Sequence, residues 1–166
     1  MTDDSTARWA LPLLQPGQAQ KEMVHNEAIT GLDLITQGVA LAILDTPPVS
    51  PEPGQAWIVG DGATGDWAGK AEHVAGWTVG GWRFVAPRAG MIFWLISEGL
   101  NARFGSGGWA SGAETAAHLS IDGAQVVGPR RPAIADPAGG SVIDIEARAA
   151  LTGILVALRA HGLIEN

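Results

Sequence analysis

The side chains that most often perform catalysis or bind metals are few in this sequence and widely separated. The chain has no Cys, and its His residues are His25, His73, His118 and His161. None of these His residues belongs to an HxH, HxxxH or HExxH arrangement, the spacings that aim two ligands at one metal. The absence of Cys excludes disulfides, thiolate zinc sites and thiol nucleophiles. We therefore predict no metal site and no bound cofactor.

Three acidic residues of the Gly-rich middle, Asp61, Asp66 and Glu72, are the candidates for a carboxylate pair. Glycoside hydrolysis needs two such groups about 5–9.5 Å apart. Acidic residues between glycines are more typical of solvated turns, and Asp61-Gly62 is itself a hairpin-turn signal. We predict no catalytic residue and a protein that is not an enzyme. A polysaccharide-cleaving enzyme remains the alternative, to be tested with Asp66→Asn and Glu72→Gln.

Tryptophan is the most unusual feature of the composition, because the chain has seven Trp and no Tyr. Large rings fill the cores of small β domains, and the apolar run "GMIFWLIS" predicts that Trp94 is a core residue. Aromatic faces on a β scaffold also serve as platforms for sugar rings. The candidates for a carbohydrate-binding surface are Trp67 and Trp77 in Gly-flanked turns, with Asp66, Lys70 and Glu72 nearby.

Composition divides the chain into the three segments that must position these residues. Residues 1–46 contain few Gly and end at the Pro-rich "TPPVSPEP", which forbids helix and favours an extended connector. Residues 47–113 contain short apolar runs separated by Gly, the pattern of an antiparallel meander or small barrel. Residues 114–166 begin with a loop and return to an Ala-rich helical pattern. The predicted fold class is α+β: an N-terminal helix, a small Gly- and Trp-rich antiparallel β domain and a C-terminal helix.

The first helix is predicted over residues 26–44, with Asn26 as its N-cap. Its apolar positions follow the heptad spacing of a coiled-coil seam. They are His25, Ala28, Leu32, Ile35, Val39 and Ala42. Gly31 and Gly38, one heptad apart, would let a neighbouring backbone approach closely. Two interpretations stay open: the stripe packs against sister copies, or it covers the chain's own β domain.

The second helix is predicted over residues 142–161, capped by Ser141 with Asp144 three residues later. Gly162 and Leu163 match a Schellman ending. One apolar stripe of this helix comprises Ala147, Leu151, Ile154 and Leu158, and a second face comprises Ile145, Ala149, Thr152 and Val156. A helix that is apolar on two sides is buried on two sides. One side would contact the β domain and the other a copy of itself.

Charge and hydropathy restrict the partners. The net charge is -7, and apart from the Arg130-Arg131 pair the basic residues are scattered singly, so nucleic acid is not an expected partner. The sequence has no run of 18 or more apolar residues and no basic segment leading into an apolar run at its start. We therefore expect no membrane insertion and no secretory signal.

Two stretches of the sequence resemble an uncharacterised protein family. They are "LPLLQPGQAQKEMVHNEAITGLD" and "GQAWIVGDGATGDWAGKAEHVAGWTVGGWRFVAPRAG", and the likeness covers roughly residues 9–110. The family is found in tail-fibre and head-spike genes of alphaproteobacterial phages and of gene transfer agents, the phage-like particles that carry host DNA between cells. The final stretch, from "VVGPRRPAIADPAGG" onward, is similar to the C-terminal ending of many phage fibre proteins.

The resemblance implies a virion-surface structural protein, a head spike or tail fibre component of a phage-like particle that is assembled in the host cytoplasm. By association it implies attachment to cell-surface polysaccharide. The apolar stripes favour a symmetric homo-oligomer, with a trimer preferred and a pentamer as the alternative, which contacts other spike, fibre or capsid proteins. Two alternatives remain: a ligand-free connector between capsid and distal fibre, and a carbohydrate-binding module that partners a separate depolymerase.

Overall fold

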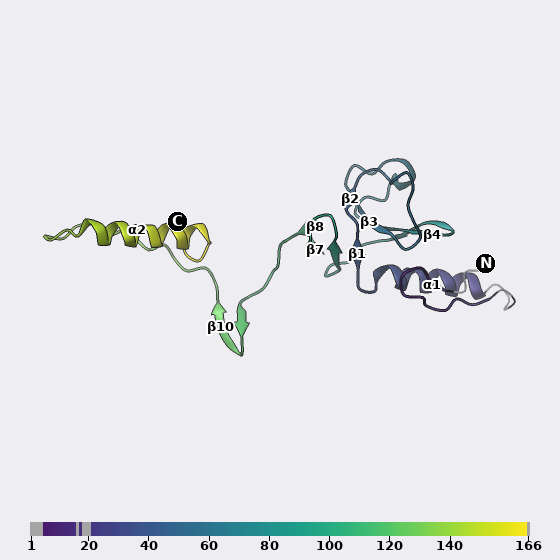
Figure 1. Cartoon of the computed structure of the whole chain (residues 1–166), viewed down its shortest axis with the longest axis horizontal. Coiled ribbons are helices and arrows are strands. Elements are labelled where there is room, and N and C mark those ends of the chain that lie inside the picture. The colour runs from purple at the N-terminus through teal and green to yellow at the C-terminus, as the bar shows by residue number, and fades with distance from the viewer. Residues whose placement is uncertain (1–4, 16, 18–20, 166) are drawn as a thin grey trace. The chain divides into compact units, whose positions relative to one another are not determined.

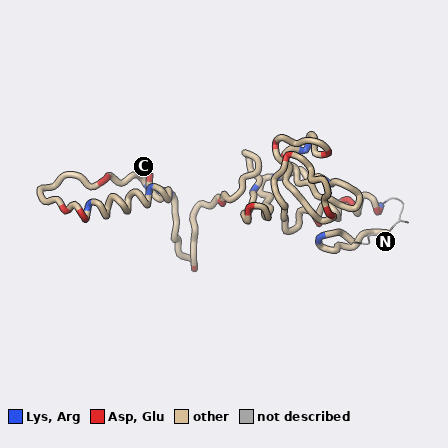
Figure 2. The backbone as a smooth tube through the Cα atoms, turned by 45° about the horizontal axis from the view of Figure 1, so that its top comes forward, with Lys and Arg blue, Asp and Glu red and all other residues tan. Residues whose placement is uncertain are grey.

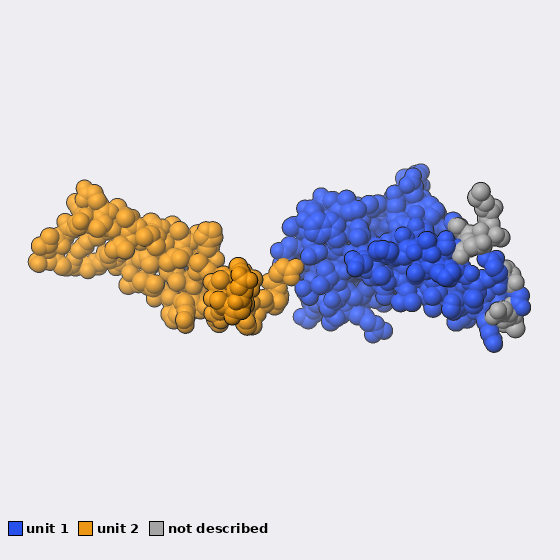
Figure 3. Space-filling view, turned by 60° about the horizontal axis from the view of Figure 1, so that its bottom comes forward, with its two compact units in different colours: residues 1–113 blue, residues 114–166 orange. Residues whose placement is uncertain are grey.

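The computed structural model describes residues 5–15, 17 and 21–165, and it divides the chain into two compact units. Unit 1 is Met1–Ala113 and unit 2 is Glu114–Asn166 (Figure 3). The predicted segments 1–46 and 47–113 lie together in unit 1. Unit 2 begins at the residue where the C-terminal module is predicted to begin.

In the described residues, the regular structure consists of two α-helices, one 3₁₀ turn and ten short strands, several of which are labelled in Figure 1. Unit 1 contains α1 (Lys21–Ile35), β1 (Val39–Ala40), β2 (Ile43–Leu44), β3 (Ala56–Val59), the 3₁₀ turn η1 (Gly65–Trp67), β4 (Val74–Thr78), β5 (Gly81–Val85), β6 (Ile92–Leu95), β7 (Leu100–Gly105) and β8 (Gly108–Ser111). Unit 2 contains β9 (Leu119–Ile121), β10 (Ala124–Val127) and α2 (Ile145–Ala160). The two helices flank a mostly antiparallel β structure, so the predicted α+β class is confirmed.

Unit 1 contains two four-stranded sheets. One has the strand order β2-β3-β4-β5 and the other β1-β6-β7-β8. The pairs β3–β4, β4–β5, β6–β7 and β7–β8 are antiparallel, as a meander predicts. The pairs β1–β6 and β2–β3 are parallel, which the sequence did not indicate.

One short segment, residues 38–44, belongs to both sheets. On one edge the carbonyl of Gly38 accepts a hydrogen bond from the backbone N–H of Trp94, 2.8 Å away. On the other edge the N–H of Leu41 donates to the carbonyl of Ala56, also at 2.8 Å. Because a single stretch of chain pairs on both sides, it links the two sheets, and their inner faces enclose one core.

The predicted first helix is wrong in both boundaries, because α1 spans Lys21–Ile35 instead of 26–44. Val39 lies in β1, and Ala42 lies between β1 and β2. Short strands that are partly buried contain apolar residues at positions that also fit a heptad, so the spacing alone does not separate the two structures. The heptad stripe therefore ends with the helix at Ile35.

Asn26 is not an N-cap but a residue of the helix interior. Its side-chain oxygen accepts from the backbone N–H of Leu14 at 2.9 Å, and its side-chain nitrogen donates to the carbonyl of Leu14 at 3.0 Å. This pair of bonds fastens the N-terminal segment to α1. The side-chain amide of Asn26 therefore forms its hydrogen bonds with the backbone of Leu14, not with the free N–H groups at the start of the helix.

Gly38 is required by a contact inside the chain. A Cβ atom at this position would lie 2.8 Å from the ring of Phe93 and 2.9 Å from the carbonyl oxygen of Ile92. The expected close approach is therefore real, but the neighbour is β6 of the same molecule. Gly31 differs, because nothing lies within 4 Å of its Cβ position.

The sheet β2-β3-β4-β5 is covered on both faces. Side chains alternate along β3, so that Ala56 and Ile58 face the first core between the sheets, whereas Trp57 and Val59 face a second cluster on the outer side. The first core also takes Leu34 from α1 and Phe93 and Leu95 from β6. The second cluster is closed by Trp67 of η1, in the loop between β3 and β4.

Unit 2 consists of the β9–β10 hairpin, an extended stretch and α2. Residues 130–140 run beside α2 (Figure 1), as contacts from Arg148 and Arg159 of the helix and from Leu163 just after it indicate. The predicted start of the helix is wrong: the helix begins at Ile145, and the N-cap is Asp144, whose carboxylate accepts from the N–H of Ala147 at 2.8 Å. Ser141 lies in the segment before it.

The predicted end of α2 is confirmed. Gly162 has a φ of 69°, the left-handed conformation expected after a helix end. The N–H of Leu163 donates to the carbonyl of Leu158 at 3.0 Å, and the N–H of Gly162 donates to that of Arg159 at 2.9 Å. These two bonds define a Schellman motif.

Candidate functional site

The best-defined polar site of unit 1 is built around Asp33 in the last turn of α1. This carboxylate is only 5% exposed. One oxygen accepts from the hydroxyl of Thr6 at 2.6 Å and from the backbone N–H of Trp9 at 2.8 Å, and the other accepts from the N–H of Arg8 at 3.1 Å. Asp33 therefore fastens the N-terminal segment to the helix through three hydrogen bonds.

Arg8 completes this site from the other direction. Its guanidinium donates to the carbonyls of Asp33 at 2.8 Å, Leu34 at 2.7 Å and Gln37 at 3.0 Å. Two of these carbonyls belong to the last turn of α1 and the third lies just beyond its end, and α1 has no basic residue in its own last turn. A remote arginine therefore caps the negative end of the helix dipole.

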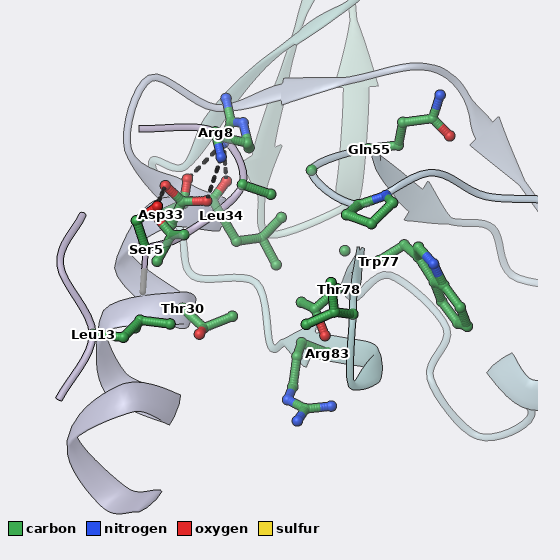
Figure 4. Close-up of a pocket in the computed structure, with 16 residues that line it drawn as sticks. Ser5, Arg8, Leu13, Thr30, Asp33, Leu34, Gln55, Trp77, Thr78 and Arg83 are labelled. Carbon is green, nitrogen blue, oxygen red and sulfur yellow. Dashed lines mark hydrogen bonds between the residues drawn. The ribbon is translucent and has the colours of Figure 1, made fainter. Parts of the chain in front are cut away.

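A hollow lies between this N-terminal segment, α1 and β4 (Figure 4). Its cavity volume is about 80 Å³, and Leu13, Leu34, Pro53 and Thr78 are among the residues that line it. Clefts that hold drug-sized ligands are about 300–1,000 Å³. The hollow has room for a small group but not for a saccharide chain.

The charged groups around the hollow are already paired. Arg83 of β5 donates to both carboxylate oxygens of Glu27, at 2.8 Å through Nε and at 2.8 Å through Nη2. This pair joins α1 to β5 of the sheet, and both side chains are partly exposed. Together with Asp33 and Arg8, it holds α1 and the N-terminal segment against the sheet.

Sequence reasoning missed the Asp33 site. The available signal was an acidic residue beside Leu34 in an apolar helix turn, where a carboxylate needs partners if it is buried. The partners stand more than twenty residues away in the sequence. Nothing in their local pattern indicates that they meet.

The structure corrects the expectation that Trp67 is exposed. Its side chain is 0% exposed, and its ring centroid lies 6.3 Å from that of Trp57 and 5.1 Å from that of Trp82. The turn η1 directs the ring onto the outer face of the sheet, where it fills the second cluster. Trp67 is therefore a core residue and presents no face to a sugar.

Trp77 is half-buried and belongs to the same cluster, with its ring edge-on to Trp82 at a centroid distance of 4.9 Å. It lines the hollow near Asp33, but its indole points away from Asp33 and Leu34 (Figure 4). The ring therefore stabilises the outer side of the sheet. The hollow and the Trp cluster lie on opposite faces of β4.

The other three predicted carbohydrate residues, Asp66, Lys70 and Glu72, have different neighbours. Lys70 places its ammonium 5.4 Å from the ring centre of Phe84, and Asp66 is exposed. Glu72 has a φ of 63° and lines a separate hollow with Asp61 and Trp109. Of the three carboxylates considered for hydrolysis, the structure brings Asp61 and Glu72 to the same hollow and leaves Asp66 outside it.

The residues of the predicted apolar stripes differ in their surroundings. On α1, His25, Ala28, Leu32 and Ile35 are exposed, whereas Val39 and Ala42 are half-buried in the β structure. On α2, Ala147, Leu151 and Ile154 are exposed and Leu158 is half-buried. The stripes on both helices therefore leave most of their residues uncovered in the single chain.

Three further features of the described residues bear on function. They contain no group of three His, Cys, Asp or Glu side chains that could hold a metal ion. No helix in residues 5–15, 17 and 21–165 is long and apolar enough to cross a membrane. Lys and Arg are spread along both units (Figure 2).

The fold therefore consists of two units. In the first, two β sheets are linked through one shared segment; the second, which follows it in the chain, contains a β hairpin and a helix. Residues 25–110, just over half of the chain, match the family described as "Protein of unknown function (DUF2793)", and the chain belongs to this family. The match runs from within α1 to β8. A comparison with curated proteins finds no match.

Proposed function

We propose that this chain is a structural protein on the surface of a phage-like particle, a component of a head spike or tail fibre, assembled as a symmetric homo-oligomer. The resemblance in the sequence supports the particle. The observation that carries the assembly is the small amount of apolar surface that unit 2 buries by itself. A trimer is the preferred form, and a pentamer matches the fivefold symmetry of a capsid vertex.

Unit 2 buries only two hydrophobic side chains among its described residues, Leu155 and Ile164. Many others are exposed, among them Leu119, Ile121 and Val126 in the hairpin and Leu151, Ile154 and Val156 in α2. Ordering each residue costs about 1–2 kcal/mol of backbone entropy, whereas a fully buried aliphatic side chain contributes about 1.5–3 kcal/mol. Two buried side chains do not offset the ordering of a unit of this length, so further burial against other chains supports it.

Attachment to host polysaccharide is the second part of the proposal. Trp67 is buried and Trp77 is half-buried in the Trp cluster, whereas Trp94 is 45% exposed on the outer face of the sheet β1-β6-β7-β8. Asn101 is directly opposite Trp94 on β7, so the two side chains share one face. An exposed indole beside a side-chain amide can stack on a sugar ring and bond its hydroxyls. Repetition of weak sites on one particle raises the avidity.

Electron microscopy and adsorption of particles that lack this protein test the proposal. Particles with bare vertices or tails and lost adsorption would support a spike or fibre that binds the receptor. A missing distal fibre on an otherwise intact base would instead support a ligand-free connector. Particles of normal appearance and infectivity would contradict a surface role.

Binding of the purified protein to host capsule, with Trp94→Ala compared with wild type, tests the attachment. The matched control is Trp9→Ala, because Trp9 is 48% exposed and lies in the N-terminal segment. Loss of binding in Trp94→Ala alone supports the proposed face. Binding by a monomeric form would favour a carbohydrate-binding module that partners a separate depolymerase.

A further inference from the structure

Helix α2 has almost no polar side that faces solvent. Its 16 residues include three charged ones, Glu146, Arg148 and Arg159. A helix of a soluble protein normally has a charged face opposite its apolar one. This helix does not, because both of its arginines are engaged with the neighbouring stretch of the same unit.

Residues 130–140 bind these two arginines. Arg159 donates to the carboxylate of Asp136 at 3.0 Å and to the carbonyl of Ile134 at 2.6 Å, and Arg148 donates to the carbonyl of Gly139. The positive charges of α2 are therefore directed toward its own unit. The remaining circumference is apolar apart from Glu146 in the first turn and the half-buried Thr152.

On one side of this circumference lies a continuous band that we name the α2 stripe. Its members are Ala147, Ala150, Leu151, Ile154, Ala157 and Leu158. They recur at spacings of three and four residues, the rhythm of helices that pack along their length. Leu151 is 51% exposed and Ile154 is 56% exposed, so the stripe is uncovered in the single chain.

The chemistry of the α2 stripe favours an identical stripe as its occupant. It contains no charged residue, so two copies meet without like-charge repulsion, and both arginines of each copy are already bonded within that copy. The Ala residues lie between the larger Leu and Ile side chains, and their small size lets a second helix approach closely. Every copy has the same deficit of buried apolar area, and packing identical stripes together around one symmetry axis reduces it in all copies at once.

We infer that copies of this chain associate through the α2 stripe, whereas the opposite face of α2 stays outside the contact. This inference rests on the proposed homo-oligomer and names its interface. The helix of each copy would then supply the core that unit 2 lacks by itself.

Two exposed residues of α2 give a matched test. Ile154 and Val156 are both 56% exposed, but because they are two residues apart on a helix their side chains point about 160° apart, toward nearly opposite sides. Lys has good helix propensity, so neither Ile154→Lys nor Val156→Lys weakens α2 through its intrinsic helix preference. The mass of wild type and both variants is measured by light scattering at micromolar concentration, and circular dichroism verifies that the β structure of unit 1 stays folded.

We expect wild type to scatter as a multiple of the 17.1 kDa chain and Ile154→Lys as single chains, with a dissociation constant raised at least ~100-fold. Val156→Lys should keep the wild-type mass. An Ile154→Lys variant of unchanged mass, or equal dissociation of both variants, would overturn the assignment of the stripe while leaving the homo-oligomer standing. A wild-type chain that is monomeric would contradict the homo-oligomer itself.

A second measurement uses the absence of native Cys. Single Ile154→Cys and Val156→Cys variants each introduce one thiol, and a disulfide between copies requires Cα atoms about 4.4–6.8 Å apart. Ile154 lies near the middle of α2, so it comes close to its counterpart in either helix orientation. Oxidation should link Ile154→Cys into covalent dimers and leave Val156→Cys unlinked; the reverse pattern would refute the stripe.

Discussion

Units 1 and 2 are both rich in apolar residues, but only unit 1 buries them. Unit 1 has two clusters in which Trp67, Ile58, Phe93 and Leu95 are within 1% of complete burial. In unit 2, whose described part includes a 16-residue helix, Leu155 and Ile164 are the buried hydrophobic side chains. Apolar content alone therefore does not decide whether a segment forms its own core.

The difference follows from how far along the chain the contacts reach. In unit 1, β1 pairs with β6 and Asp33 binds residues near the N-terminus, so distant segments close around one interior. In unit 2 the β9–β10 hairpin is local, and the long-range bonds run along one side of α2. A layer that is covered on one side leaves its other side exposed in the single chain.

Separating the two units gives the largest expected effect. Residues 1–113 alone should unfold in one cooperative urea transition, because both clusters and both sheets lie within them. Residues 114–166 alone should show no cooperative transition as a single chain, and any helicity should increase with protein concentration. Circular dichroism measures both. A cooperative, concentration-independent transition of 114–166 would remove the contrast between the units.

Trp67→Ala tests the second cluster of unit 1. Removing a completely buried indole should cost about 3–5 kcal/mol in the free energy of unfolding. Trp94→Ala is the control, since Trp94 is 45% exposed and should cost about 1 kcal/mol or less. Urea denaturation followed by circular dichroism measures both. Equal losses for the two variants would mean that the outer cluster adds little to the stability of unit 1.

Asp33→Ala tests the attachment of the N-terminal segment. The substitution leaves the hydroxyl of Thr6 and the N–H groups of Arg8 and Trp9 without their acceptor and should cost about 2–4 kcal/mol. Limited proteolysis should then cut the N-terminal segment faster than in wild type. Asp66→Ala removes an exposed carboxylate and should change stability by about 0.5 kcal/mol or less. An unaltered cleavage rate in Asp33→Ala would contradict the anchoring role.

Gly38→Ala and Gly31→Ala give the smallest effects, of opposite sign. The first places a methyl group against Phe93 and Ile92 and should destabilise by about 1–3 kcal/mol. The second fills open space on α1 and should stabilise by up to about 1 kcal/mol, the propensity difference between Gly and Ala in a helix. Thermal unfolding of both variants measures the signs. Destabilisation by Gly31→Ala would indicate that a neighbour packs against this part of α1.

The predicted fold class, the Gly- and Trp-rich β region and the Schellman end of α2 depend on local patterns, and the structure confirms each of them. Gly162 and Leu163 specify that ending because all of its hydrogen bonds lie within a few residues. The predicted start at Ser141 was wrong by one turn, since Asp144 caps equally well and is nearer the helix. Local signals therefore identify elements better than their boundaries.

The environment of individual side chains depends on which distant segment packs against them. No local sequence pattern predicts this. Trp67 was predicted to be exposed and is buried, whereas Trp94 was predicted to be a core residue and is 45% exposed. Neither the Gly-flanked turn around Trp67 nor the apolar run around Trp94 specifies which face of a sheet the ring meets. The predicted carbohydrate residues were close in sequence, but strand alternation and the turn η1 place them in different surroundings.

Composition, glycine placement and helix-ending residues thus specify an α+β chain whose two ends are helical, because these signals act over a few neighbouring residues. The parallel pairing of residues 38–44, the burial of Asp33 and the orientation of each Trp arise only when segments far apart in the sequence are packed together. Each of these features depends on contacts with a segment that is distant in the sequence, and the local sequence does not specify which segment that is.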